Sequence, residues 1–425
     1  MRHFFGIFLF LLSFTLLAAE HSLTDFKYKK GVATFVDFKN AHYKIVFDFQ
    51  KKSTLVTSTI EFYQETSGHP VFDLHNTIYN ITVDSKSTSA QAVQPPSSET
   101  TVMVLSDSLT KGSHKLVMQS ILTDYTGPIF TEEKYLDFFF SLNDLSDREF
   151  LEIYVPSSFE YDKVKMTFEI ELKGTKTQHK LYNNGSLKTI GLNHFIVTFP
   201  DYFTTSSPYL HLVKNDLYHE LNFEIDSMTG RKIPVTIYSD SLEIAEKTKA
   251  ETLAVVAELE ETIAPWPHPA LLIQVYEGGA GMEYAGALVG GDEAIRHEII
   301  HSYFARGVMP PDGKSAWIDE SLTGWIENGY LASSNFARDS DGNIVSPRVN
   351  NLSIYKRDTL GPDYWGEYFF SYLNLKFSYQ GGLKKFLPYL FNKYKFQFVT
   401  TEILKQELEH FYSVDLTQDF ATYIY

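Results

Sequence analysis

The first half of the chain alternates hydrophobic and polar residues over short segments. The alternating segments are residues 42–49, 54–62, 115–118, 149–155 and 164–172, and clusters rich in Gly, Pro, Asn and Ser separate them. Such alternation places hydrophobic side chains on one face of a strand and polar side chains on the other. The pattern predicts a β-rich N-terminal domain over residues 20–213, mostly antiparallel and similar to a β-sandwich.

The pattern changes near residue 214. Residues 234–238 and 271–276 are short apolar segments typical of strands. Between them, residues 241–263 carry hydrophobic residues at helical spacing, which predicts a long helix. Most of the remaining chain is expected to be helical. The expected fold class is therefore α+β and multidomain, with a second domain over residues 214–425.

Residues 1–19 have the build of a secretory signal. They begin with Met1-Arg2-His3, continue as an apolar run and end in Ala18-Ala19, an order that predicts a cleavable signal peptide. An uncleaved anchor is the alternative, although the run is shorter than the ~20 apolar residues that span a bilayer. We expect an exported protein, periplasmic or extracellular, without stable membrane insertion after cleavage.

Charge and cysteine content exclude several classes of function. The formal charge is −16 at pH 7, from 37 Lys and Arg against 53 Asp and Glu. Binding to nucleic acids depends on clustered basic side chains, so no nucleic-acid partner is expected. The chain has no cysteine, which excludes disulfides, thiolate metal sites and a cysteine nucleophile.

The strongest chemical signal is a His-Glu-x-x-His motif that begins at His297. The surrounding residues keep helical spacing, with Asp292 as the expected N-cap and Gly307 at the expected end of the helix. On such a helix His297 and His301 lie one turn apart, where both imidazoles can bind a single Zn²⁺. Glu298 is then the candidate general base, able to take a proton from water.

A third candidate ligand follows on the next predicted helix. Eighteen residues separate His301 from Glu320, which lies in an amphipathic segment that begins at Trp317. Two His and one Glu leave the fourth zinc position open, as a catalytic zinc site requires. The sequence therefore predicts one zinc ion held by His297, His301 and Glu320.

This spacing resembles that of the aminopeptidase N family of gluzincin zinc metallopeptidases. Asp319 stands where the family usually has Asn before the third ligand. The resemblance implies a thermolysin-like zinc peptidase domain over residues 214–425 and hydrolysis of peptide substrates. The large C-terminal helical domain of full-length members has no counterpart in these 425 residues, which implies a more open active site.

A second segment, Gly279-Ala280-Gly281-Met282-Glu283-Tyr284, resembles the family's G-x-M-E-N substrate-binding strand. The resemblance implies that Glu283 holds the free amino terminus of a peptide and that the backbone from Gly279 to Met282 pairs with the substrate. Aminopeptidase activity is therefore expected. Tyr284 replaces the usual Asn, so endopeptidase activity stays open.

The family also uses a tyrosine to stabilise the oxyanion. Tyr364, at the start of a predicted helix, is the expected counterpart, and Tyr368 and Tyr355 remain alternatives. Two other functions are compatible with this sequence. One is zinc-dependent hydrolysis of a non-peptide substrate, and the other is an inactive binding module.

Overall fold

A computed structural model of the chain describes residues 24–96, 101–122, 130–140, 151–158, 163–311, 315–334 and 362–425. The expected signal at residues 1–19 and the alternative tyrosine Tyr355 lie outside the described residues. No helix in the described part of the chain is long and apolar enough to cross a membrane.

The N-terminal domain consists of three sheets. The strand orders are β14-β15-β12-β3-β4-β10-β6-β7, β1-β2-β5-β9-β8 and β11-β16-β13. The strands are β1 (Phe26–Tyr28), β2 (Gly31–Phe35), β3 (Asp37–Asp48), β4 (Ser53–Gln64), β5 (His69–Phe72), β6 (Ile78–Val83), β7 (Lys86–Ser87), β8 (Ala90–Val93), β9 (Val102–Leu105), β10 (Gly112–Ile121), β11 (Phe138–Phe139), β12 (Lys165–Lys173), β13 (His179–Asn183), β14 (Ser186–Gly191), β15 (His194–Thr198) and β16 (Leu210–Lys214).

The long strands β3 and β4 carry the core of this domain. Tyr43, Ile45 and Phe47 of β3 are buried, and the residues between them are partly exposed. Among the described strand pairs of this domain, all are antiparallel except β3 with β12 and β2 with β5. The alternating pattern in the sequence thus correctly predicted a mostly antiparallel domain, with one buried face along the long strands β3 and β4.

The second domain combines one sheet with a helical part. Its strand order is β17-β18-β19-β21-β20, and β18, β19 and β21 run parallel. The elements are β17 (His219–Asp226), β18 (Lys232–Ser239), α1 (Leu242–Thr262), β19 (Leu271–Tyr276), β20 (Gly281–Tyr284), β21 (Ala287–Gly291), α2 (Ile295–Phe304), α3 (Trp317–Glu327), α4 (Pro362–Lys376), α5 (Phe386–Tyr394), α6 (Thr401–Tyr412) and α7 (Thr417–Tyr423). The fold is α+β and multidomain.

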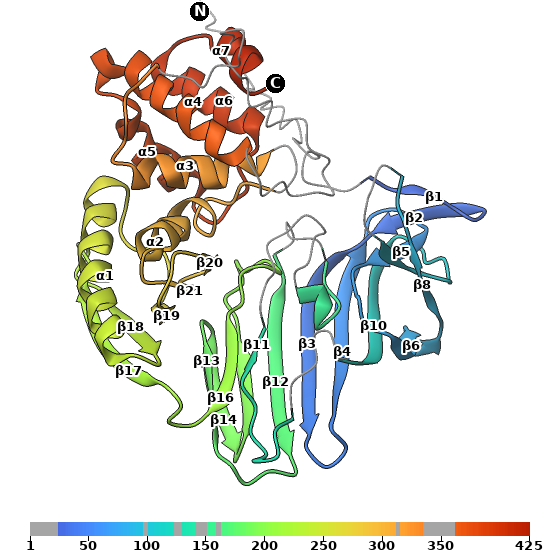
Figure 1. Ribbon diagram of the computed structural model, residues 1–425. Helices are drawn as coiled ribbons and strands as arrows, with labels where there is room; N and C mark the ends of the chain where they lie inside the picture. The colour runs from blue at the N-terminus through green and yellow to red at the C-terminus, as the bar shows by residue number, and fades with distance from the viewer. Residues whose placement is uncertain are drawn as a thin grey trace, which may run out of the picture.

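The two domains meet through aromatic side chains and one asparagine. Tyr284 of β20 is fully buried, with its ring 5.0 Å from that of Tyr209 and 6.2 Å from that of Phe139. The Asn184 amide donates to the Ala285 carbonyl at 2.9 Å, which ties the N-terminal domain to the β20–β21 turn. Figure 1 shows the sheet of β11, β16 and β13 on the side of its domain that faces the second domain.

The expected strand at residues 149–155 is wrong. The structure has a short 3-10 helix over Leu151–Ile153, and residues 152–158 are all buried. Asn76 donates to the Ile153 carbonyl, and an isolated bridge joins Asp73 to Ser157. The alternation of Leu and Glu therefore does not mark a strand with one exposed face, because both faces of this segment are inside the domain.

Candidate metal centre

Three elements of the second domain build the candidate site. Helix α2 carries the His-Glu-x-x-His motif, α3 carries the third candidate ligand, and β20 is the edge strand of the sheet. In Figure 1, α2 lies between the β20–β21 hairpin and α3. Segments far apart in the sequence are thereby brought to one place.

Helix α2 is positioned by burial rather than by a polar cap. It begins at Ile295, with Ala294 at the N-cap and no side-chain cap bond. The expected N-cap, Asp292, instead accepts from the Gly278 amide at 3.2 Å and pairs with Lys247 at 2.6 Å. The N-cap prediction is therefore wrong. Most side chains of α2 are buried, which fixes the helix between the sheet and its helical neighbours.

The three candidate ligands converge. Glu320 Oε2 lies 3.2 Å from His297 Nε2 and 3.7 Å from His301 Nε2. A tetrahedral zinc ion with bonds of about 2.0–2.1 Å needs ligand atoms about 3.3 Å apart. The spacing of these atoms matches that requirement. His297 and Glu320 are partly exposed and His301 is buried, so the group is reached from one side.

Two further carboxylates fix the orientation of the imidazoles. Glu327 Oε2 lies 2.8 Å from His297 Nδ1, and Asp319 Oδ1 lies 2.6 Å from His301 Nδ1. A carboxylate at Nδ1 holds the proton on that nitrogen and leaves Nε2 as the metal-binding atom. The sequence reasoning noted Asp319 only as a departure from the family and missed Glu327. Glu327 could have been found, since it lies two turns beyond Glu320 on the same helix.

The electrostatics of the group favour a cation. Burial lowers the pKa of His297, but its hydrogen bonds to Glu320 and Glu327 outweigh burial and raise that pKa to about 11. Burial also lowers the pKa of His301, and the charge of Asp319 leads the contributions that raise it to about 9. The carboxylates around both imidazoles therefore favour positive charges at this position. A divalent metal ion would take the place of these positive charges.

Glu298 lies beside the ligands in a buried position. Burial, helped by the negative charge of Glu283, raises the pKa of the Glu298 carboxyl to about 8. Its Oε2 atom is buried and has no hydrogen-bond partner among the described residues. A carboxylate that lacks a protein donor and has a raised pKa is suited to accept a proton from a bound molecule.

The glycines of the β20–β21 hairpin allow this close packing. A Cβ atom added at Gly281 would lie 2.4 Å from Glu298 Oε1 and 2.7 Å from Glu298 Cγ. The small residue expected for approach of a substrate chain is therefore also required by the general base. As the last strand in the sheet order, β20 pairs only with β21 among the described strands, which leaves its outer edge for another chain.

The side chains of the neighbouring residues Glu283 and Tyr284 lie in different environments. Glu283 is buried, and its carboxylate lies within 4.8 Å of ligand-type atoms of Glu298 and His301. Arg306 Nη2 lies 2.9 Å from Glu283 Oε1. Tyr284 turns the other way, into the domain interface. The sequence reasoning missed Arg306, because nothing in its spacing marks it as a partner of Glu283.

For Tyr364, the tyrosine expected to stabilise the oxyanion, the structure describes only the backbone. Tyr364 lies in the first turn of α4, and its side chain lies outside the described residues. The alternative Tyr368 is 42% exposed. The prediction for Tyr364 therefore stays a prediction.

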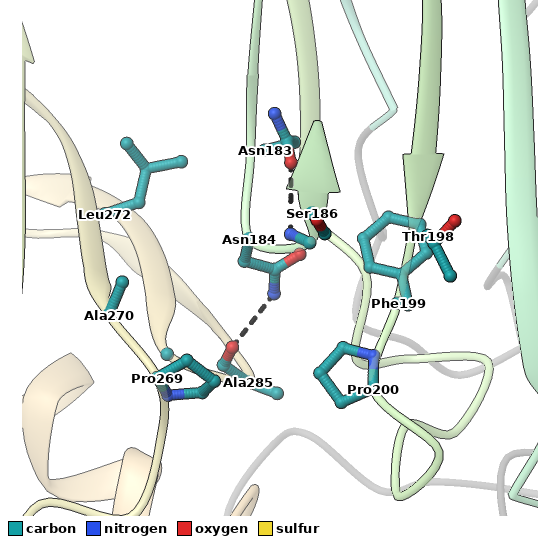
Figure 2. Close-up of a pocket in the computed structure, with 12 residues that line it drawn as sticks. Asn183, Asn184, Ser186, Thr198, Phe199, Pro200, Pro269, Ala270, Leu272 and Ala285 are labelled. Atoms are coloured by element: carbon teal, nitrogen blue, oxygen red, sulfur yellow. Dashed lines mark hydrogen bonds between the residues drawn. The ribbon is translucent and has the colours of Figure 1, made fainter. Parts of the chain in front are cut away.

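A cavity of about 510 Å³ lies away from this group, at the turn that joins β20 to β21. Figure 2 shows Asn184, Phe199 and Pro200 of the N-terminal domain opposite Pro269, Ala270 and Leu272 of the second domain. Its lining is mostly apolar and contains no titratable side chain. We assign this cavity to the packing between the domains.

The fold is similar to solved metallopeptidase structures. No protein-family model and no curated protein matches the sequence. Legionella pneumophila aminopeptidase A superposes with a TM-score of 0.68 at 13% identity, covering 94% of this chain and 50% of its own. Yeast LTA4 hydrolase gives 0.67 at 15% identity, covering 92% and 68%. The M1 zinc metallopeptidase of Deinococcus radiodurans gives 0.61 at 12% identity, covering 90% and 91%.

These likenesses show that the chain shares the two-part fold of M1 zinc metallopeptidases, including a β-rich N-terminal domain. The chain spans half the length of the Legionella protein. At such low identity the likeness concerns the fold alone, and the function rests on the residues of the site.

Proposed function

We propose that this protein is a zinc-dependent peptide hydrolase. One observation carries the proposal: the Nε2 atoms of His297 and His301 converge on Glu320 Oε2 at spacings that suit zinc, beside the buried Glu298 carboxylate. The names of the structural neighbours, two of them zinc metallopeptidases or aminopeptidases, favour the same chemistry.

His297, His301 and Glu320 would hold the zinc ion, one per chain. When bound, zinc would supply a positive charge that polarises a carbonyl group and lowers the pKa of water. Glu298 accepts the proton of the attacking water, because its carboxylate lies next to the ligands without a protein donor on Oε2. Glu298 then gives the proton to the leaving amine.

The substrate is proposed to bind as an extended chain along the outer edge of β20. Main-chain groups from Gly279 to Met282 would pair with the backbone of the peptide, as in β-strand addition. We propose Tyr364 as the donor that faces the oxyanion, on the basis of the family resemblance. On the same basis we propose that residues 214–425 form a thermolysin-like peptidase domain.

Three specificities fit this chemistry. The resemblance and the aminopeptidase among the neighbours favour removal of N-terminal residues, and cleavage at internal bonds is the second candidate. Hydrolysis of a non-peptide substrate is a third, and one neighbour is named LTA4 hydrolase. An inactive binding module has less support, because Asp319 and Glu327 contact the Nδ1 atoms of both imidazoles, as the orienting carboxylates of metal-binding histidines do.

Zinc analysis and one isosteric variant test this proposal. We expect one zinc per purified chain and peptide hydrolysis that a chelator abolishes and zinc restores. Glu298→Gln should keep the zinc and lower turnover by about a hundredfold to ten-thousandfold. Glu293→Gln, an exposed residue next to α2, should behave like wild type. Protein without stoichiometric zinc, or unchanged turnover in Glu298→Gln, would refute the proposal.

We also propose that the protein is exported, on the basis of residues 1–19. Sequencing the N-terminus of protein recovered from outside the cytoplasm tests this. A start near residue 20 is expected, and retention of Met1 in the cytoplasm would contradict it.

A further inference from the structure

A buried ion pair lies at the position where the resemblance expects a peptide's amino terminus. The side chains of Arg306 and Glu283 are 6% and 4% exposed, and Arg306 Nη2 lies 2.9 Å from Glu283 Oε1. Glu283 is therefore not an isolated anion waiting for a ligand. Its charge is balanced within the chain.

Arg306 is fixed in place by other contacts. Its backbone amide donates to the His301 carbonyl at 2.9 Å, just beyond the end of α2. Its Nη1 atom donates to Ser206 Oγ of the N-terminal domain at 2.5 Å. Arg306 thus contacts the end of α2 through its backbone, and the edge strand and the other domain through its guanidinium. Moving it away would leave a buried carboxylate without compensation, which is strongly unfavourable.

A substrate ammonium group gains little at such a pair. An isolated buried carboxylate attracts an ammonium ion strongly, but a carboxylate already paired with a guanidinium presents a net charge of zero. The ammonium group would also lose its hydration on entering a site next to a second cation. A peptide that has no charge at this position avoids both costs. The binding free energy therefore favours substrates that have an amide group, rather than an ammonium group, beside Glu283.

We infer that the Glu283–Arg306 pair removes the preference for a free amino terminus, so that the site accepts peptides whose residue before the cleaved bond is itself acylated. The substrate class is then internal or N-blocked peptide segments, bound through their backbone along β20. This inference rests on the proposed hydrolase function and gives it a specificity.

Matched substrates test the inference. One peptide is prepared with a free amino terminus and with an N-acetyl group, and kcat/KM is measured for both. We expect the two values to agree within about threefold, which is well below the tenfold difference that ~1.4 kcal/mol produces. Arg306→Gln should raise the ratio in favour of the free peptide by about tenfold or more, because it leaves the Glu283 charge unbalanced, whereas Glu283→Gln should not raise that ratio. Lys376→Gln, which breaks an ion pair to Asp419 in the C-terminal helices, is the control.

A binding measurement keeps the inference independent of turnover and of the folding of Arg306→Gln. Dissociation constants of leucine hydroxamate and N-acetyl-leucine hydroxamate are measured on zinc-loaded wild type and Glu283→Gln. We expect a ratio within about threefold in wild type and no preference for the free amine in Glu283→Gln. A preference for the free amine above about tenfold that disappears in Glu283→Gln overturns the inference.

Failure of the proposed function gives a different result. If neither peptide is cleaved while both hydroxamates bind, the hydrolase proposal fails, and the ratio of dissociation constants still decides the inference. A chain that takes up no zinc and binds neither hydroxamate overturns both.

Discussion

Replacing Gly281 by alanine is expected to displace the general base and to lower turnover by about a hundredfold, because a misplacement near 1 Å costs that much. The backbone of Gly281 packs directly on the Glu298 side chain. An added Cβ atom would lie 2.4 Å from Oε1, 2.6 Å from the carboxyl carbon and 2.7 Å from Cγ of Glu298. Ordinary contacts between such atoms are about 3.5–4.0 Å.

Relief of this overlap needs a shift of about 1 Å, since the shortfall against the ordinary distance is that large. The movement falls on Glu298, because Gly281 is held in register with Gly290 of β21. Since the overlap includes Cγ, rotation of the carboxylate alone does not relieve it. The three atoms nearest to the added Cβ all belong to Glu298 and none to the candidate zinc ligands, so we expect zinc content to stay at the wild-type level.

Gly290→Ala is the matched control. A Cβ atom at Gly290 would lie 3.6 Å from Glu298 Cγ, an ordinary contact. We expect kcat of Gly290→Ala to stay within about threefold of wild type, well under the factor of ten that ~1.4 kcal/mol represents. The assay is kcat with zinc content and thermal unfolding on the same preparations. Wild-type turnover in Gly281→Ala, or an equal loss in both variants, would show that contact with Glu298 does not position the base.

Three other predictions follow from the same structure. Asp319→Ala and Glu327→Ala should each weaken zinc binding by about 10- to 100-fold in chelator competition, because each removes the carboxylate that orients one imidazole. Unchanged zinc affinity would contradict this orienting role. Tyr364→Phe should lower kcat by about 10²–10³-fold, because it removes one hydrogen-bond donor to the oxyanion. Tyr368→Phe should have little effect on kcat. A loss in Tyr368→Phe but not in Tyr364→Phe would show that Tyr368 is the donor. His268 is buried, and burial lowers its pKa to about 3. The imidazole has a pKa of about 6.5 in the unfolded chain, so between these two pKa values only the unfolded chain takes up a proton. The free energy of unfolding therefore falls as the pH falls below about 6.5. Between pH 7 and pH 4, wild type should lose about 3 kcal/mol more than His268→Gln in denaturant unfolding; equal losses would show that His268 protonates freely in the folded protein.

The sequence predicted the regular elements well where one strong pattern governed each. The helix expected at residues 241–263 is observed over Leu242–Thr262, and the strand expected at residues 271–276 is Leu271–Tyr276. Both have long or uniform hydrophobic patterns and clear stop signals. The sequence also predicted that His297 and His301 lie on one face of a helix, because side chains four residues apart on a helix lie one turn apart on the same face.

Tertiary relations were not accessible from the same reasoning. The pair of Glu283 with Arg306 joins residues on different elements, and its formation depends on how the edge strand packs against the end of α2. The missing N-cap of α2 has a similar origin, since Asp292 finds a better partner in Lys247 on α1. In both cases packing between elements overrides the preference of the local sequence.

The departures from the family pattern are mutually consistent in the structure. Asp319 places a carboxylate on the Nδ1 atom of His301, which suits the proposed metal site. Tyr284 fills the interface with the N-terminal domain and takes no part in the pocket. Beside these two residues, Arg306 pairs with Glu283, and the proposed loss of amine selectivity rests on that pair. The proposed zinc site and the proposed recognition of the substrate's end therefore depend on different residues, so a loss of zinc chemistry and a loss of amine selectivity can be separated by experiment in this protein.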